Sequence, residues 1–100
     1  MNIKNITIKF ALELNDENNI LIDVRSIESF KVGSIPNAIN IPVGEVLIKS
    51  KDLDITKKYY VFCNSGHKSQ IATNILSRNG FDAHNILGGY TGYLEYQKTK

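Results

Sequence analysis

The chain has 100 residues, of which 42% are hydrophobic and 22% are charged, and its formal net charge is +2 at pH 7. A chain of this length can bury one hydrophobic core but not two, so we expect a single domain over residues 1–100. The 12 lysine and arginine residues occur singly or in a doublet rather than in runs. This distribution argues against nucleic-acid binding and favours an ordinary mixed-charge surface.

Cysteine and histidine usage narrows the chemistry further. Cys63 is the only cysteine, so the chain cannot form an internal disulfide, and a free thiol suits a reducing compartment. The two histidines, His67 and His84, are too few and too scattered for a zinc site, and we expect no metal and no other cofactor. Charged residues interrupt the N-terminal segment, and no stretch reaches the roughly 20 apolar residues of a membrane span. We therefore expect a cytoplasmic protein without membrane contact.

The first half of the chain alternates short apolar runs with amphipathic segments, which predicts parallel strands joined by crossover helices. The run 19–24 (NILIDV) predicts a strand buried on both faces of a sheet. The segment 10–14 is ambiguous, because its apolar residues alternate as in a strand while its alanine, leucine and glutamate favour a helix; we expect a short helix. The other elements expected here are a short strand at 5–8, a loop marked by Gly33, Pro36 and Asn37, a short strand at 38–42, and a helix over 43–49 that begins after Pro42.

The second half contains the clearest helix, over 68–79, and Gly80 stands where its C-terminal cap is expected. This helix follows a strand predicted at 57–63 (KKYYVFC) and precedes a short strand at 83–87. Residues 88–89, both glycine, then open a final helix. The predicted fold class is α/β: a small three-layer sandwich with a central, mainly parallel sheet of about five strands flanked by helices.

Three of these strands end in residues that can take part in chemistry. Asp23 and Arg25 lie at the end of one strand, Cys63 ends another, and Gly88 with Gly89 follows a third. Because ligands of open parallel sheets bind beyond the carboxyl ends of the strands, these positions are expected to meet at one edge of the sheet. Asp23 and Arg25 also have a purely structural interpretation, as a strand-end cap and a surface or half-buried ion pair.

Cys63 stands between an apolar strand and a polar loop that leads into a helix. The N-terminus of a helix favours a thiolate, and a tight loop can turn further amides toward an anion. Gly66 permits the positive φ that such a loop needs, and Lys68 adds a cation. We therefore predict a partly exposed, nucleophilic Cys63, with a substrate-binding loop formed by Asn64, Ser65, Gly66, His67, Lys68 and Ser69.

Plainer interpretations of the same residues remain open. Cysteine is often a small buried hydrophobe, which the apolar residues before Cys63 would suit. Ser65 and Ser69 could simply cap the following helix. His67 has no identifiable orienting carboxylate or amide beside it, so no cysteine-protease base is assigned.

Two segments together resemble rhodanese-like domains. LIDVRSIESFKVGSIPNAINIP is similar to the N-terminal signature of that family, and VFCNSGHKSQIATNILSRNGFDAHNILGGYTGY is similar to its cysteine loop, helix and closing Gly-Gly segment. The resemblance implies a sulfurtransferase in which Cys63 takes a sulfane sulfur from a small anionic donor such as thiosulfate and holds it as a persulfide. The sulfur would then pass to a thiol, a protein or a cyanide acceptor, with Asp23 and Arg25 supporting the loop.

Several positions depart from the family pattern. Lys68 stands where the family usually has arginine, which keeps the attraction for an anion but loses the two-pronged grip. Ser34 replaces a frequent histidine. Ser29 replaces an acidic residue, which leaves Glu28 as a substitute partner for Arg25.

Two alternative functions remain. Related phosphatases and arsenate reductases resemble Cys-x5-Arg, with more room for a tetrahedral anion; here Ser69 is six residues after Cys63, and the cation, Lys68, comes one position earlier. A rhodanese-like domain can also be a non-catalytic binding or regulatory module, but such modules often lack the cysteine that this chain retains.

Overall fold

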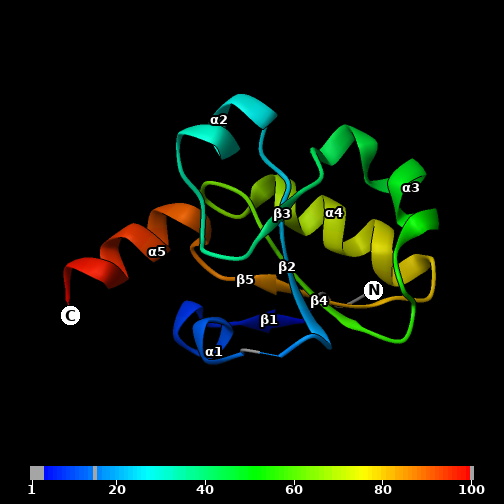
Figure 1. Cartoon of the computed structure of the whole chain (residues 1–100), viewed down its shortest axis with the longest axis horizontal. Coiled ribbons are helices and arrows are strands. Elements are labelled where there is room, and N and C mark those ends of the chain that lie inside the picture. Colours follow the sequence, from blue (N-terminus) through cyan, green and yellow to red (C-terminus); the bar gives the residue numbers. More distant parts are fainter. Residues whose placement is uncertain (1–3, 15, 100) are drawn as a thin grey trace.

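The computed structural model describes residues 4–14 and 16–99, and its centre is a five-stranded sheet in the order β1-β5-β4-β2-β3. Every paired neighbour runs parallel, which confirms the predicted α/β class (Figure 1). The strands are β1 (Asn5–Ile6), β2 (Asn19–Asp23), β3 (Ile39–Asn40), β4 (Lys58–Phe62) and β5 (Asp82–Ile86). The helices are α1 (Ile8–Glu13), α2 (Ile27–Val32), α3 (Val46–Lys49), α4 (His67–Arg78) and α5 (Gly89–Lys98), with short 3-10 turns at Val43–Glu45 and Ser50–Asp52.

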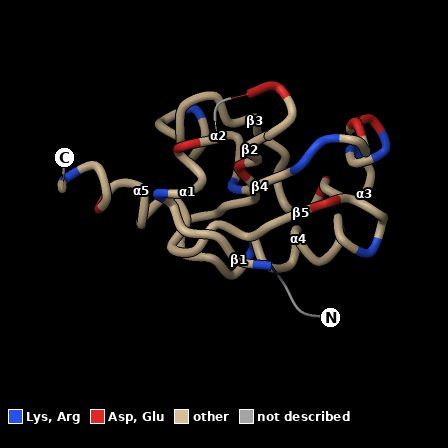
Figure 2. Tube along the Cα trace, turned by 90° about the horizontal axis from the view of Figure 1, so that it is seen from below, with Lys and Arg blue, Asp and Glu red and all other residues tan. Residues whose placement is uncertain are grey.

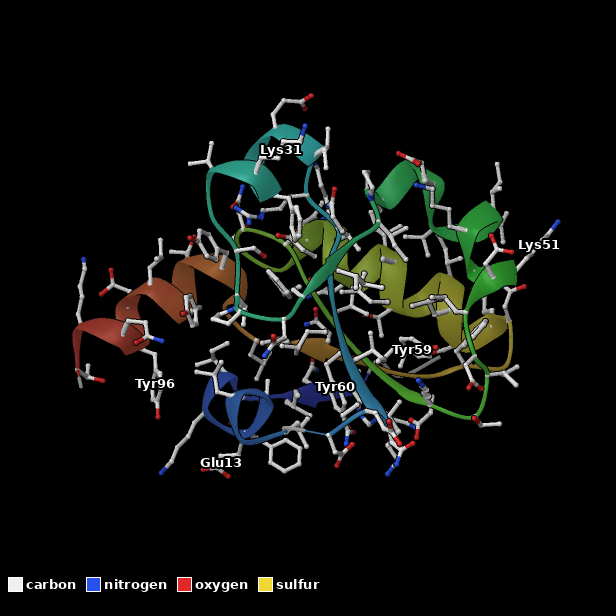
Figure 3. All side chains as sticks on the ribbon, viewed as in Figure 1. Glu13, Lys31, Lys51, Tyr59, Tyr60 and Tyr96 are labelled. Carbon is white, nitrogen blue, oxygen red and sulfur yellow. The ribbon has the colours of Figure 1, made fainter. Side chains whose placement is uncertain are left out.

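Two hydrophobic cores cover the two faces of the sheet. Successive side chains of a strand point to opposite faces, so Tyr59 and Val61 of β4 enter one core and Tyr60 and Phe62 enter the other. Figure 3 shows Tyr59 and Tyr60 on opposite sides of the strand. The first core lies beneath α3 and α4, and the second lies beneath α1 and α5.

The register of β2 and β4 sets the position of the site. Asp23, at the end of β2, lies beside Phe62, at the end of β4, so both strands end at the same edge of the sheet. The N–H of Val24 donates to the carbonyl oxygen of Phe62 at 2.9 Å, which continues this pairing one step further. Cys63, which directly follows β4, therefore lies at the same end of the sheet as Arg25, which follows β2. This is the arrangement predicted for a parallel sheet.

The helix expected in segment 10–14 is confirmed as part of α1, while other elements differ from the sequence expectations. The expected strand over 5–8 is shorter, because Thr7 caps α1 by accepting from the N–H of Phe10. The helix expected over 43–49 is a 3-10 turn at Val43–Glu45 followed by α3. The strand expected at 38–42 is reduced to Ile39–Asn40. Helix α2 was not predicted at all; Ser26 caps it by accepting from the N–H of Ser29.

The described residues show neither a one-sided charge distribution nor a membrane-spanning or metal-binding feature. Basic and acidic positions are interspersed along the trace in Figure 2. Within residues 4–14 and 16–99, no helix has the length and apolarity needed to cross a membrane. The same residues contain no group of three or more His, Cys, Asp or Glu side chains that could hold a metal ion.

Candidate active site

A pocket of about 250 Å³ opens at the carboxyl edge of the sheet, with Cys63 in its wall. One side comes from the loop after β4 and the start of α4, and the other comes from the segment that follows β2. Its lining residues are Arg25, Ser26, Ser29, Cys63, Asn64, Ser65, His67 and Lys68. The structure thus brings together most of the predicted site residues and adds Ser26 and Ser29, which sequence reasoning did not assign to a pocket.

Cys63 is buried, with 3% of the residue exposed, so the expectation of a partly exposed thiol is wrong. The loop folds back over the sulfur. The N–H of Gly66 donates to Sγ at 3.0 Å and the N–H of Ser69 donates at 3.4 Å. Gly66, with φ of +116°, makes this turn possible. Backbone N–H groups of the loop therefore converge on the sulfur, as the sequence predicted for an anion-binding loop.

Burial and hydrogen bonding act on the Cys63 thiol in opposite directions. Desolvation raises the pKa of Cys63, while hydrogen bonds from the Ser69 side chain and from the backbone N–H groups of Ser69, Gly66 and Ser65 lower it. The hydrogen bonds prevail, and the pKa lies below the ordinary value of 9.0. The loop thus favours the thiolate, which is the nucleophilic form.

The N-terminus of α5 forms hydrogen bonds with the backbone of the cysteine loop. The N–H of Tyr90 donates to the carbonyl oxygen of Cys63 at 2.7 Å, and the N–H of Thr91 donates to that of Asn64 at 3.0 Å. Gly89 makes this approach possible, because a Cβ there would collide with the Cys63 carbonyl oxygen. Its φ of +56° also favours glycine. Gly89 thus belongs to the site by position, as the strand-end rule indicated.

Asp23 and Arg25 form a buried ion pair beside the loop. Arg25 Nη2 donates to Asp23 Oδ2 at 2.6 Å, and Nε lies within 3.1 Å of both carboxylate oxygens. The side chains are 7% and 0% exposed for Arg25 and Asp23. The ion-pair interpretation is therefore confirmed, although the pair is buried. The suggested pairing of Arg25 with Glu28 is wrong, because Asp23 occupies the guanidinium.

The remaining groups of Arg25 connect this pair to its surroundings. Nη2 also donates to the carbonyl oxygen of Gly33 at 2.5 Å, and the guanidinium lies over the Tyr90 ring at 4.2 Å from its centroid. Nη1 approaches Asn64 Oδ1 at 3.5 Å. Arg25 is thereby fixed with its outer nitrogen toward the cysteine loop.

The two loop serines do not cap α4. The capping position is Gly66, which makes no side-chain cap bond, and the helix begins at His67 rather than at Lys68 as expected. Ser69 is completely buried, and its hydroxyl donates to Asn85 Oδ1 at 2.5 Å. Ser65 is exposed at the pocket.

His67 and Lys68 form the exposed rim of the pocket. They are close enough to meet a ligand entering from solvent, whereas Ser69 lies behind the sulfur in the core of the loop. Asn85, in β5, is the partner of Ser69 that the sequence analysis did not identify.

The family model for the rhodanese-like domain matches residues 7–96. The chain belongs to the rhodanese-like family. Among its relatives, "Putative sulfurtransferase YtwF" of Bacillus subtilis is 36% identical over 85 residues, which cover 85% of this chain and 82% of that protein. "Putative sulfur carrier protein YrkF" of the same organism is 34% identical over 67 residues, which cover 67% of this chain but only 36% of that protein. The rhodanese-like chain thus spans about a third of one relative and most of the other.

Solved structures agree with this assignment. A rhodanese-related protein from Thermoplasma volcanium superposes with a TM-score of 0.85 at 34% identity, covering 93% of this chain and 92% of that one. The human single-domain sulfurtransferase TSTD1 gives a TM-score of 0.81 at 25% identity, covering 94% and 97%. The protein is accordingly a member of the rhodanese-like sulfurtransferase family.

Proposed function

We propose that this rhodanese-like domain transfers a sulfane sulfur from a small anionic donor such as thiosulfate to a thiol or cyanide acceptor, through a persulfide on Cys63. The observation that carries the proposal is the position of the Cys63 sulfur. It borders a pocket, and the amides of Gly66 and Ser69 point at it. Residues 1–100 would act as one domain in this reaction.

The first half-reaction requires a thiolate and an anion held in line with it. The Cys63 thiolate attacks the outer sulfur of thiosulfate, the S–S bond of the donor breaks, and sulfite leaves with the bonding electron pair. The product is a Cys63 persulfide whose negative charge sits on the outer sulfur. The lowered pKa of Cys63 supports this step, because no separate base has to remove the proton at the moment of attack.

The second half-reaction returns the enzyme to its starting state. A thiolate or cyanide attacks the outer persulfide sulfur, and Cys63 leaves as a thiolate. The amides that stabilise the thiolate therefore assist both half-reactions: they make Cys63 available as a nucleophile and then as a leaving group. The pocket of about 250 Å³ suits a small anion or the tip of a thiol side chain rather than a bulky substrate.

Charge near the pocket favours an anionic donor. Lys68 and His67 are exposed on the rim, and Lys68 provides a point charge for attracting thiosulfate. Arg25 lines the same pocket, but Asp23 offsets its charge. We assign Asn64, Ser65, Gly66, His67, Lys68 and Ser69 to the binding loop, and Asp23 with Arg25 to its support. Donor capture then depends mainly on Lys68.

We also propose a cellular compartment and partners for this reaction. A carrier thiol with no second cysteine in the chain works where reductants keep it free, which favours the cytoplasm. Relatives named as a sulfur carrier protein and as sulfurtransferases support a partner that donates sulfur and one that accepts it.

The phosphatase alternative is less well supported by the loop. A phosphate-binding loop of the Cys-x5-Arg type needs a fork-shaped cation at the sixth position, where this chain has the buried Ser69. A pure binding module would have no use for a thiol whose pKa is lowered by converging amides.

Intact-mass measurement after incubation with thiosulfate tests the proposal. We expect the protein to gain one sulfur atom, and cyanide or a thiol to remove it. The Cys63→Ser variant should gain none, because a hydroxyl is too poor a nucleophile without a dedicated base. Hydrolysis of an aryl phosphate that depends on Cys63, with no sulfur gained, would favour the phosphatase instead.

A further inference from the structure

A chain of polar side chains connects the Cys63 sulfur to the edge strand β1. Ser69 Oγ lies 3.5 Å from Sγ, and Asn85 Oδ1 lies 2.5 Å from Ser69 Oγ. Asn85 Nδ2 donates in turn to Asn5 Oδ1 at 2.9 Å. Because Ser69 and Asn85 are 0% and 1% exposed, bulk water does not compete for the bonds between them.

The Ser69 hydroxyl has one proton and three acceptors near it among the described residues. These are Asn85 Oδ1 at 2.5 Å, the Gly66 carbonyl oxygen at 3.2 Å and Cys63 Sγ at 3.5 Å. The single proton favours the shortest contact, which is the one to Asn85. With the proton directed there, Ser69 Oγ accepts the S–H of the neutral thiol. Once the thiolate forms, the sulfur and Asn85 Oδ1 compete for the same Ser69 proton, whose donation to the sulfur lowers the pKa of Cys63.

Strand β1 fixes the orientation of the Asn85 amide. Asn5 and Asn85 are register partners in the β1–β5 ladder, and the backbone N–H of Asn85 donates to the carbonyl oxygen of Lys4 at 2.7 Å. Turning the Asn85 amide over would bring its oxygen against the Asn5 side-chain oxygen that now accepts from it. The carboxamide oxygen is therefore held toward Ser69.

We propose that Asn85 is a positioning residue for Cys63, whose amide oxygen holds the Ser69 hydroxyl away from the sulfur and so limits the stabilisation of the thiolate. When the thiolate is more strongly stabilised, it is a weaker nucleophile but a better leaving group. Asn85 would therefore balance the two half-reactions. This last consequence rests on the proposed function, whereas the effect of Asn85 on the thiol does not.

Other charged or titratable groups also surround the thiol. Arg25, His67 and Lys68 line the pocket, Asp23 is paired with Arg25, and Tyr90 of α5 stacks on that guanidinium. The substitutions used below leave all five unchanged. A change in the titration of Cys63 can thus be attributed to the Ser69–Asn85 contact.

Titration of the thiolate by its ultraviolet absorbance tests the proposal without any sulfur donor. In Asn85→Leu, which removes the competing acceptor at similar size, the titration midpoint should move to lower pH. The thiolate fraction at a pH below the midpoint should rise about three- to ten-fold, as one hydrogen bond to the sulfur is strengthened. In Asn85→Asp, which only accepts and carries a negative charge, the midpoint should move to higher pH.

The matched control is the same substitution without the Ser69 hydroxyl. Asn85→Leu in a Ser69→Ala background should leave the midpoint where Ser69→Ala alone places it. If Asn85→Leu does not fold, Asn5→Ala at the exposed edge frees the amide to turn and should lower the midpoint by a smaller amount. The proposal would be overturned if the titration midpoint of Cys63 did not fall in folded Asn85→Leu or Asn5→Ala. It would also be overturned if Asn85→Leu lowered the midpoint by the same amount in the Ser69→Ala background. Failure of thiosulfate to load Cys63 would count only against the proposed function.

Discussion

At the scale of single residues, the near-complete burial of Cys63 and its lowered pKa have one cause. The amides that approach the sulfur also cover it, since Gly66 and Ser69 both donate to Sγ across the loop. Desolvation would raise the pKa on its own, but these donors more than offset it. Because Cys63 lines the pocket, we expect its thiol to react with a small reagent that enters there.

The lowered pKa of Cys63 predicts a pH dependence with a definite sign. Thiolate formation should have a lower midpoint in the folded protein than in the protein unfolded by denaturant, as measured by the pH dependence of alkylation with a small reagent. The folded state binds the proton more weakly, so the stability contributed by the thiolate should rise as pH increases through the folded pKa toward 9.0. Equal midpoints in the two states would contradict the role of the loop amides.

Lys68 provides the second prediction at this scale. Lys68→Ala should raise the apparent KM for thiosulfate roughly three- to ten-fold, because the cation is exposed and its attraction is screened, and the effect should shrink at high salt. Lys68→Arg should keep most of the activity. Lys51, an exposed lysine that does not line the pocket and is labelled in Figure 3, gives the matched control as Lys51→Ala. An equal rise in KM for both alanine variants would remove Lys68 from donor capture.

At the scale of elements, the start of α5 is the support of the cysteine loop. Its first N–H groups bond the carbonyl oxygens of Cys63 and Asn64, so the loop is held between α5 and the start of α4. Gly89 stands at the closest approach, in a left-handed conformation.

Gly89→Ala should therefore harm both stability and activity. The added methyl group must displace the Cys63 carbonyl and adopt an unfavourable φ, at a cost of about 1–3 kcal/mol in the free energy of unfolding. Thermal unfolding and thiosulfate loading measure the two effects. Gly44→Ala is the control, because no atom lies within 4 Å of a Cβ at that position. A Gly89→Ala protein as stable and active as Gly44→Ala would show that the close approach is not needed.

The strands and helices differ in how well the sequence could predict them. Strands β2 and β4 are buried between two helical layers, so their continuous apolar runs are strong signals. Helix α2 has only six residues and none of them is buried, so its apolar positions are too few to show a sustained helical period. The depth of Cys63 depends on the turn at Gly66 and the approach of α5, which are contacts between distant segments. Asn85 carried no clear signal, because it is one of three polar residues in the five-residue strand β5.

At the scale of the whole molecule, the Asp23–Arg25 pair joins the parts that surround the pocket. Ser34 donates to Asp23 Oδ2 at 2.7 Å, and Asn40 Nδ2 donates to the backbone oxygens of Asp23 and Arg25 at 2.9 and 3.0 Å. Arg25 also donates to the carbonyl oxygen of Gly33. Through these contacts the buried ion pair at the end of β2 is hydrogen-bonded to β3 and to the segment after α2. Removing the charge of Asp23 or of Arg25 would leave the other as a buried charge without its partner.

Asp23→Asn should consequently destabilise the entire fold rather than the loop alone. It leaves the buried Arg25 guanidinium without its carboxylate, which typically costs about 3–5 kcal/mol in the free energy of unfolding. The exposed pair of Glu45 and Lys49 offers the contrast: it makes a single contact at 2.9 Å on the surface, and Lys49→Ala should cost less than about 1 kcal/mol. Guanidinium chloride unfolding curves measure both. The double variant Asp23→Asn, Arg25→Gln should recover part of the loss, because it removes the unpaired charge together with the pair. Similar unfolding midpoints for Asp23→Asn and Lys49→Ala would show that the buried pair does not hold the pocket to the sheet.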